Sequence, residues 1–189
     1  MQPVRGAFDL HSLTGDWMAE VLMVLPPERF RDEELLVARG VLESAGHRCV
    51  VASTRTGTLV GSRGGSVGCE VRIDSESASA YGAVVFVGGG GSRLLWDNAD
   101  AHRLAREALG QGRVLGALCL APVILARAGV LSGRRATVAG TESASIEEAG
   151  ASYAGPGVTV DGLIVTANGP KSSAAFGERI VELLDSGRA

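Results

Sequence analysis

The segment from Arg113 to Gly129, RVLGALCLAPVILARAG, places a short apolar strand directly before an apolar helix. Residues 114–118 form the small, apolar run of a core strand, and the spacing becomes helical after Pro122. Proline suits the first turn of a helix, because the N–H that it lacks would have no partner there. The segment therefore predicts a buried strand that turns sharply into a helix, with Cys119 at the corner.

Strands and helices alternate along the rest of the chain. Residues 20–25 are a continuous apolar run, which is typical of a strand buried on both faces. Further strands are expected at 48–52, 83–87, 114–118, 136–139, 158–160 and 163–166, and helices at 32–43, about 97–110, from Pro122 to Gly129, 142–149 and 176–184. The helix at 32–43 is expected to turn inward Leu35, Leu36, Val41 and Leu42.

This alternation predicts an α/β fold with a doubly wound, mostly parallel sheet and helices on both faces. Residues 54–79, which are rich in Gly, Ser and Thr, suggest a β-arm or hairpin outside the main sheet. Asp161-Gly162 predicts a hairpin turn near the end of the chain. In such sheets the functional crevice lies beyond the carboxyl ends of the strands, so we expect the site near residue 25, the glycine run 88–91 and Cys119.

Composition limits the class of protein. The 189 residues are 46% hydrophobic, which predicts a single globular domain over 19–189 after a polar extension at 1–18. A net charge of −3 argues against a nucleic-acid partner, and the lack of an 18-residue apolar run argues against a membrane partner. The first 18 residues lack the apolar core of a signal peptide, so free thiols in a reducing cytoplasm are expected for Cys49, Cys69 and Cys119.

Cys119 carries the chemistry that the sequence suggests. A thiol at the start of a helix faces unpaired N–H groups and the positive end of the helix dipole, which favour the thiolate. The arrangement is that of a nucleophile elbow with cysteine in place of serine. The alternative is a small cysteine that packs in the core. Cys49 alternates within a strand and is expected in the core, whereas Cys69 in the arm could be exposed.

These elements, in this order, resemble the ThiJ/PfpI family, which includes the Parkinsonism-associated deglycase and belongs to the class I glutamine amidotransferase-like superfamily. The resemblance runs from about residue 20 to 185. Four segments carry it: FRDEEL at 30–35, VVFVGG at 84–89, ALCLAP at 117–122 and DGLIVTANGP at 161–170. It implies a flavodoxin-like fold assembled as a homodimer or a higher homo-oligomer.

The resemblance also implies a set of site residues. Cys119 matches the elbow cysteine, and Glu34 matches the acidic residue that approaches its sulfur, although a one-residue slip of the loop would put Glu33 there. The alternative for Glu34 is an ordinary acidic residue in a first helical turn. Gly89 and the backbone N–H of Leu120 match the oxyanion hole, where such donors stabilise developing negative charge. Residues expected to border the pocket are Gly88, Gly90, Asn168 and Pro170.

The sequence lacks the histidine that a cysteine protease requires beside its thiolate. Leu120 stands where one branch of the family has that histidine, and residues 138–140 lack the histidine of another branch. His11 lies in the extension, His47 is expected at the opposite edge of the sheet, and His102 is expected to face solvent. These positions disfavour proteolysis. No spacing suggests a metal site, and residues 88–91 lack the phosphate-binding motif, so no cofactor is expected.

Three functions remain. The first is an enzyme acting on small carbonyl compounds, similar to a glyoxalase or deglycase, in which Cys119 adds to an aldehyde and Glu34 shuttles the proton. The second is a redox-responsive or stress-protective protein in which Cys119 is oxidised beside a protonated Glu34. The third is a family member that has kept the fold without the chemistry. In the first two, a carboxyl beside a thiolate is expected to be pushed toward its protonated form.

Overall fold

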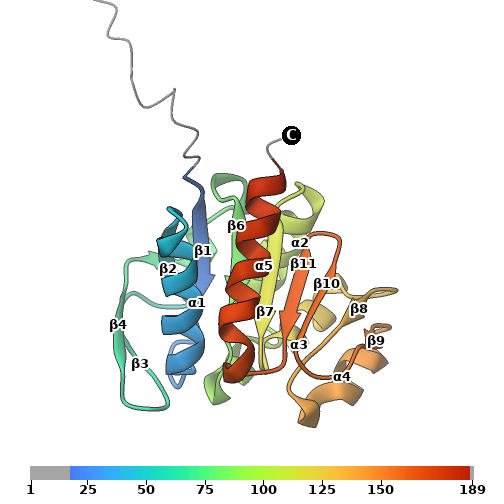
Figure 1. Ribbon diagram of the computed structural model, residues 1–189. Coiled ribbons are helices and arrows are strands. Elements are labelled where there is room, and N and C mark those ends of the chain that lie inside the picture. The colour runs from blue at the N-terminus through green and yellow to red at the C-terminus, as the bar shows by residue number, and fades with distance from the viewer. Residues whose placement is uncertain (1–17, 188–189) are drawn as a thin grey trace, which may run out of the picture.

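The computed structural model describes residues 18–187. Of the expected extension at 1–18, only Met18 belongs to these residues. His11 lies outside them. A seven-stranded sheet forms the centre of the molecule (Figure 1), with its strands in the order β10-β11-β7-β6-β1-β2-β5. The strands are β1 (Glu20–Val24), β2 (Arg48–Ser53), β5 (Val71–Arg72), β6 (Ala83–Phe86), β7 (Val114–Leu118), β10 (Val158–Asp161) and β11 (Ile164–Ala167).

All neighbouring strands of this sheet pair in parallel except β10, which pairs antiparallel with β11 around the Asp161-Gly162 turn. The predicted flavodoxin-like α/β fold is confirmed. The prediction for the Gly/Ser/Thr-rich arm is confirmed only in part. Strands β3 (Gly57–Val60) and β4 (Ser66–Cys69) form a separate hairpin, but the short β5 joins the edge of the main sheet.

Helices cover both faces of the sheet. Helices α1 (Asp32–Ser44) and α5 (Ser173–Ser186) lie side by side on the near face in Figure 1. The far face carries α2 (Ala99–Gly110) and α3 (Pro122–Arg127), with α4 (Ser143–Glu148) packed against α3. Short 3-10 turns cover Ile73–Ser75, Ala78–Ala80, Gly90–Leu95, Gly140–Glu142 and Pro170–Ser172.

Strand β1 shows why its apolar run is continuous. Val21 and Met23 pack into the cluster under α1 and α5, whereas Leu22 and Val24 pack into the cluster on the other face. Each successive side chain of a strand points to the opposite face, so a strand covered by helices on both sides needs apolar residues throughout.

The structure corrects two details of the elements. Leu36 was expected to face inward with Leu35, but its exposed fraction is 66%. Successive helical residues are about 100° apart, and Leu35, Ala38 and Leu42 already occupy the buried side of α1. The strand expected at 136–139 is only Arg135–Ala136, and it pairs with β9 (Ser152–Tyr153) in a small sheet of its own.

Strands β1, β6 and β7 are neighbours in the sheet, so the segments that follow their carboxyl ends converge. These segments are the loop 25–31, the glycine run 88–91 and the Cys119 corner. Within residues 18–187, no helix is long and apolar enough to cross a membrane.

Candidate functional site

A cavity of about 380 Å³ lies at the carboxyl ends of these strands. It brings together six residues that the sequence singled out: Glu34, Gly89, Gly90, Cys119, Leu120 and Pro170. Four further residues complete its wall, namely Arg31, Ser62, Ala139 and Thr141.

Cys119 occupies a strained corner. Its φ is 58°, a left-handed conformation that is costly for a residue other than glycine and is found where the surroundings hold it in place. The Cys119 N–H donates to the Ala167 carbonyl oxygen at the end of β11 (2.8 Å), and its own carbonyl accepts from the Ala139 N–H (2.8 Å). These two bonds fix the corner between β7 and α3, so the predicted elbow is present.

Glu34 reaches the same place from the first turn of α1. Its side chain is fully buried, and its Oε2 accepts a hydrogen bond from the Gly88 N–H (3.0 Å). Its Oε1 makes no hydrogen bond within the described part of the chain. Burial, which disfavours the charged form, raises the pKa of Glu34 to about 7. The sequence-based expectation of a readily protonated Glu34 therefore has the right direction.

Glu33, the alternative acidic residue, lies elsewhere. Its carboxylate pairs with the guanidinium of Arg31 at 2.8 Å and is half exposed. It is not among the residues that line the cavity. Of the two glutamates, only Glu34 stands beside Cys119.

The protonation of the thiol differs from the expectation based on the helix end. Burial, together with the charge of Glu34, raises the pKa of Cys119 to about 12. The backbone N–H groups of Gly89 and Leu120 face the sulfur and lower that pKa, but they do not outweigh burial. Helix α3 has only six residues, so few peptide dipoles add up at its amino end to favour the thiolate.

Cys119 and Glu34 titrate as a pair because each shifts the pKa of the other. When Glu34 holds the proton, its charge no longer opposes a thiolate, and the N–H groups of Gly89 and Leu120 favour one. Burial, the largest cause of the raised Cys119 pKa, remains in that state, so the resting sulfur is a thiol near neutral pH and the ionised Glu34 is the group beside it that can take up its proton during a reaction.

The glycine run is required by a close approach of two loops. Arg31 N–H donates to the Gly88 carbonyl oxygen (2.9 Å), and Gly91 N–H donates to the Arg29 carbonyl oxygen (3.2 Å). A Cβ on Gly89, whose φ is 104°, would lie 2.4 Å from the Arg31 nitrogen, and one on Gly91 would lie 1.8 Å from the Glu28 carbonyl oxygen. Only glycine lets the backbone after β6 lie this close to the loop after β1.

Two residues expected at the pocket do not line the cavity. Gly88 lies beneath the wall, where a Cβ would be 2.6 Å from Glu34 Oε2 and 2.7 Å from Cys119 Cβ. Asn168 fastens neighbouring loops instead, since its Oδ1 accepts from the Gly157 N–H (3.0 Å) and the Ser172 hydroxyl (2.9 Å).

The histidines of the described chain lie away from the cavity. His47 is buried at the amino end of β2, as expected, and its Nδ1 accepts from the Ala19 N–H. His102 is half-buried rather than solvent-facing, with its Nε2 2.7 Å from the Trp96 carbonyl oxygen. Neither of these two histidines lines the cavity.

The other two thiols are buried. Cys49 lies in the core as predicted, and burial raises its pKa to about 12. For Cys69 the sequence left exposure open, and the structure shows it 4% exposed because the inner side of β4 packs against β2; burial raises its pKa as well.

Ser62 is a cavity residue that sequence reasoning missed. It sits in the turn of the β3–β4 hairpin, and the carboxylate of Asp32 holds that turn by accepting from the N–H groups of Arg63 and Gly65, each at 2.7 Å. The only local signal is a glycine-rich turn, which does not reveal that the hairpin folds over the start of α1.

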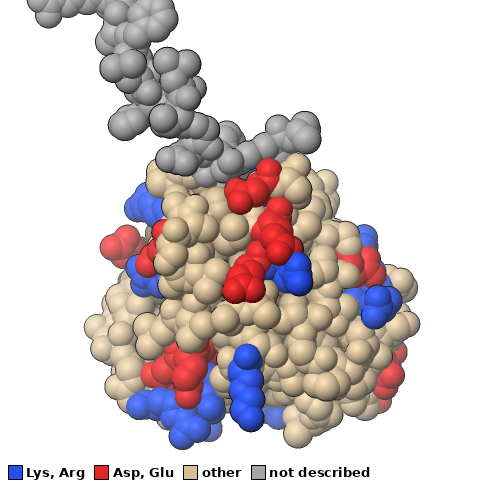
Figure 2. All heavy atoms as spheres, viewed as in Figure 1, with Lys and Arg blue, Asp and Glu red and all other residues tan. Residues whose placement is uncertain are grey.

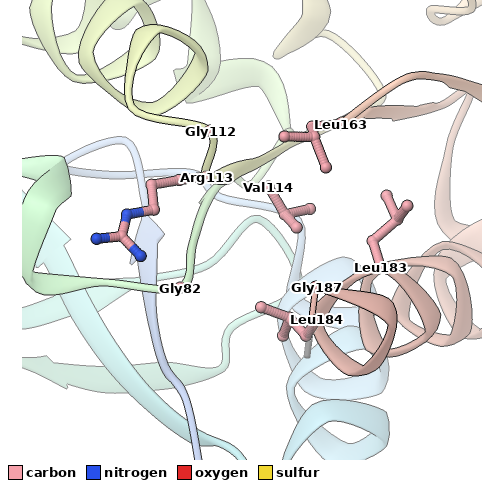
Figure 3. Close-up of a pocket in the computed structure, with 8 residues that line it drawn as sticks. All are labelled: Gly82, Gly112, Arg113, Val114, Leu163, Leu183, Leu184 and Gly187. Carbon is pink, nitrogen blue, oxygen red and sulfur yellow. The ribbon is translucent and has the colours of Figure 1, made fainter. Parts of the chain in front are cut away.

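A second cavity, of about 330 Å³, lies at the opposite edge of the sheet (Figure 3). Its apolar side chains come from the start of β7, the residue before β11 and the end of α5, with Arg113 beside them. Among the described residues, no thiol and no carboxyl group lines it. Within residues 18–187, no group of three or more His, Cys, Asp or Glu residues could hold a metal ion.

Comparisons with known proteins show which sequences and structures the chain resembles. The sequence profile of the DJ-1/PfpI family matches residues 19–183. The chain is 41% identical to an uncharacterized protein of Methanocaldococcus jannaschii, over 88% of this chain and 83% of the relative. It is 29% identical to the deglycase PfpI of Pyrococcus furiosus, over 86% and 98%. The crystal structure of a ThiJ/PfpI domain protein from Brachyspira murdochii superposes with a TM-score of 0.86 at 34% identity, covering 88% of this chain and 96% of that one.

Proposed function

Because the chain belongs to the DJ-1/PfpI family, we propose that it is an enzyme acting on small carbonyl compounds, similar to a glyoxalase or deglycase. The observation that carries the proposal is the convergence of Cys119, Glu34 and the N–H groups of Gly89 and Leu120 on one cavity. A deglycase among the relatives supports the substrate class.

The proposed first step is the addition of the Cys119 sulfur to an aldehyde carbon. The carbonyl π bond breaks, a C–S bond forms, and negative charge develops on the former carbonyl oxygen. The N–H groups of Gly89 and Leu120 are placed to stabilise that oxygen. The thiol proton passes through Glu34 to the oxygen, which gives a hemithioacetal and returns the carboxyl group to its starting state.

Glu34 suits this shuttle because its pKa of about 7 lets it hold or release a proton near neutral pH. It is also the only carboxyl group among the residues that line the cavity. The wall has no histidine base, so we do not propose proteolysis.

The test is the consumption of glyoxal and methylglyoxal by the wild type, Cys119→Ser and Glu34→Gln. We expect each variant to lose at least about 100-fold in kcat/KM, the scale of a missing nucleophile or general acid. Glu33→Gln is the matched control and should retain turnover, because Glu33 lies outside the cavity wall. Turnover that survives Cys119→Ser in a folded protein would refute the proposal.

A redox-responsive role is the second candidate, and one observation favours it. Glu34 Oε1 has no hydrogen-bond partner in the described chain, so a protonated carboxyl could donate to an oxygen added to Cys119. With hydrogen peroxide as the oxidant, the thiolate would become a sulfenic and then a sulfinic acid, with one peroxide reduced at each step. A mass gain of about 32 Da at Cys119, reduced in Glu34→Ala, would support this role. The absence of both turnover and this mass gain would leave a non-catalytic family member.

A further inference from the structure

Arg29 lies next to the cavity wall on constrained backbone. Its φ is 54°, and it is fixed by two hydrogen bonds: its N–H donates to the Val60 carbonyl oxygen (2.8 Å) and its carbonyl accepts from the Gly91 N–H (3.2 Å). Its guanidinium lies over Gly90, where a Cβ would be 3.2 Å from Arg29 Nη2. Gly90 is part of the cavity wall, so the guanidinium lies beside that wall, although Arg29 is not itself among the lining residues.

The charge of Arg29 is not neutralised by a carboxylate in the described chain. Other arginines near the cavity have partners: Arg31 pairs with Glu33 (2.8 Å), Arg63 lies 3.9 Å from the same carboxylate, and Arg93 pairs with Glu142 (2.9 Å). The Arg29 guanidinium is exposed, and no carboxylate among residues 18–187 lies within 4.0 Å of it. This holds for the neighbouring Glu28 as well.

No carboxylate in the cavity wall neutralises the Arg29 guanidinium at neutral pH. Glu34 is the only carboxyl group in the wall, and it takes up a proton near neutrality. Lys171 follows the wall residue Pro170 and is exposed. Figure 2 shows basic side chains along the lower edge of the visible face, below α1 and α5, where the parallel strands end, with acidic side chains directly beside some of them. An anion that approaches the cavity wall beside Gly90 therefore meets a guanidinium with no carboxylate partner in the described chain.

We propose that Arg29 binds an anionic group of the substrate, a carboxylate or a phosphate, so that the site prefers aldehydes that carry such a group. Arginine suits this role because its planar guanidinium can donate two parallel hydrogen bonds to either anion. The inference rests on the proposed function for the identity of the reacting carbonyl, but the anion site itself can be tested without turnover.

The test compares two alkylating reagents of almost the same size at Cys119, anionic iodoacetate and neutral iodoacetamide. Rates are read by peptide mass spectrometry for the wild type, Arg29→Gln and Arg29→Lys. The ratio of the two rates cancels any change in thiol reactivity that both reagents share. We expect Arg29→Gln to lower the iodoacetate-to-iodoacetamide ratio about threefold to fivefold at low salt, as suits one solvent-exposed charge. Arg29→Lys should restore most of the ratio.

Arg179→Gln is the matched control, since Arg179 is exposed on α5 and pairs with Glu182. It should leave the ratio at the wild-type value. Inorganic phosphate should slow iodoacetate more than iodoacetamide in the wild type, a measurement that needs no variant to fold. An unchanged ratio in Arg29→Gln, or no selective effect of phosphate when that variant does not fold, would overturn the inference.

Substrate preference is the second arm. The wild type should favour glyoxylate over glyoxal, or glyceraldehyde 3-phosphate over glyceraldehyde, and the favoured pair identifies carboxylate or phosphate as the anion. Arg29→Gln should reduce that preference by a similar factor. A ratio that depends on Arg29 without turnover of any aldehyde would refute the proposed function and keep the anion site. Turnover of glyoxal together with an alkylation ratio that does not depend on Arg29 would keep the proposed function and refute the anion site.

Discussion

The fully buried carboxyl group of Glu34 is expected to make the stability of the protein depend on pH. Its pKa is about 7 in the folded protein and 4.5 in a model compound. Between these pH values the folded protein holds a proton that the unfolded chain has released. The folded state therefore loses stability as pH rises from about 4.5 to about 7, by on the order of 3 kcal/mol, and the loss is complete above that range.

Replacing Glu34 by glutamine should remove this pH dependence. Glutamine has the shape of the protonated carboxyl, so Glu34→Gln should match the wild type near pH 4.5 and exceed it in unfolding free energy at pH 8. Urea unfolding at pH 5, 6, 7 and 8 measures the difference. Glu178→Gln, an exposed change on α5, should keep the wild-type slope. Parallel pH curves for the wild type and Glu34→Gln would show that the carboxyl group is not perturbed.

At the scale of single residues, the sequence identified Cys119 and Glu34 and the direction of the Glu34 pKa shift, but not the protonation of the thiol. Cys119 and Glu34 follow from a strand–helix corner and a family motif, both of which are local patterns. The raised pKa of Cys119 depends on how completely other segments bury it, and local sequence does not contain that information. Arg31, Ser62 and Thr141 were missed for the same reason, because they reach the cavity from loops whose positions depend on the whole fold.

At the scale of elements, the close approach of two loops explains why alanine should cost different amounts of stability at different positions of the glycine run. A Cβ on Gly91 would lie 1.8 Å from a backbone oxygen, which cannot move without displacing the loop after β1. A Cβ on Gly90 would meet only the flexible side chain of Arg29, at 3.2 Å. We therefore expect Gly91→Ala to destabilise the fold by about 3 kcal/mol or more, and Gly90→Ala by less than about 1 kcal/mol.

Thermal unfolding of the two variants beside the wild type measures this contrast. The residues are adjacent and the added methyl group is the same, so each variant controls for the other. Equal losses of stability in Gly90→Ala and Gly91→Ala would mean that the loops do not approach as closely as described.

Elements with a strong pattern were predicted well, and those without one were not. The apolar runs of β1, β6 and β7 and the Asp161-Gly162 turn each determined an element close to its observed bounds. The error at Leu36 arose because a helix with two adjacent leucines does not show which of them faces the sheet. The direction was settled by contact with α5 and the hairpin rather than by the helix itself.

At the scale of the whole molecule, the mostly parallel sheet and the position of the cavity at the carboxyl ends of the strands followed from the alternation of elements, whereas the order of the strands did not. Assembly does not follow in the same way, because an interface depends on surface residues with no periodic pattern. We propose that the protein forms a homo-oligomer through the surface around Leu36. Leu36 and Val37 are exposed on α1 (66% and 40%), and Leu36 borders a groove shared with the hairpin.

Light scattering coupled to size-exclusion chromatography tests this proposal. The wild type should elute with the mass of a dimer or larger, and Leu36→Glu should shift it toward the monomer, because an interface cannot bury an unpaired carboxylate cheaply. Leu94→Glu changes an equally exposed leucine elsewhere (57%) and should leave the mass unaltered. A monomeric wild type at micromolar concentration would contradict the proposal.

The contrast among the three cysteines has a practical consequence. Cys49 and Cys69 are buried within strands of the folded protein, whereas Cys119 borders an open cavity. The natural chain therefore offers one chemically addressable position in its described part, with no cysteine to remove beforehand. A trifluoromethyl or nitroxide tag attached there would turn the protein into a reporter of its own pocket, sensitive to each molecule that enters.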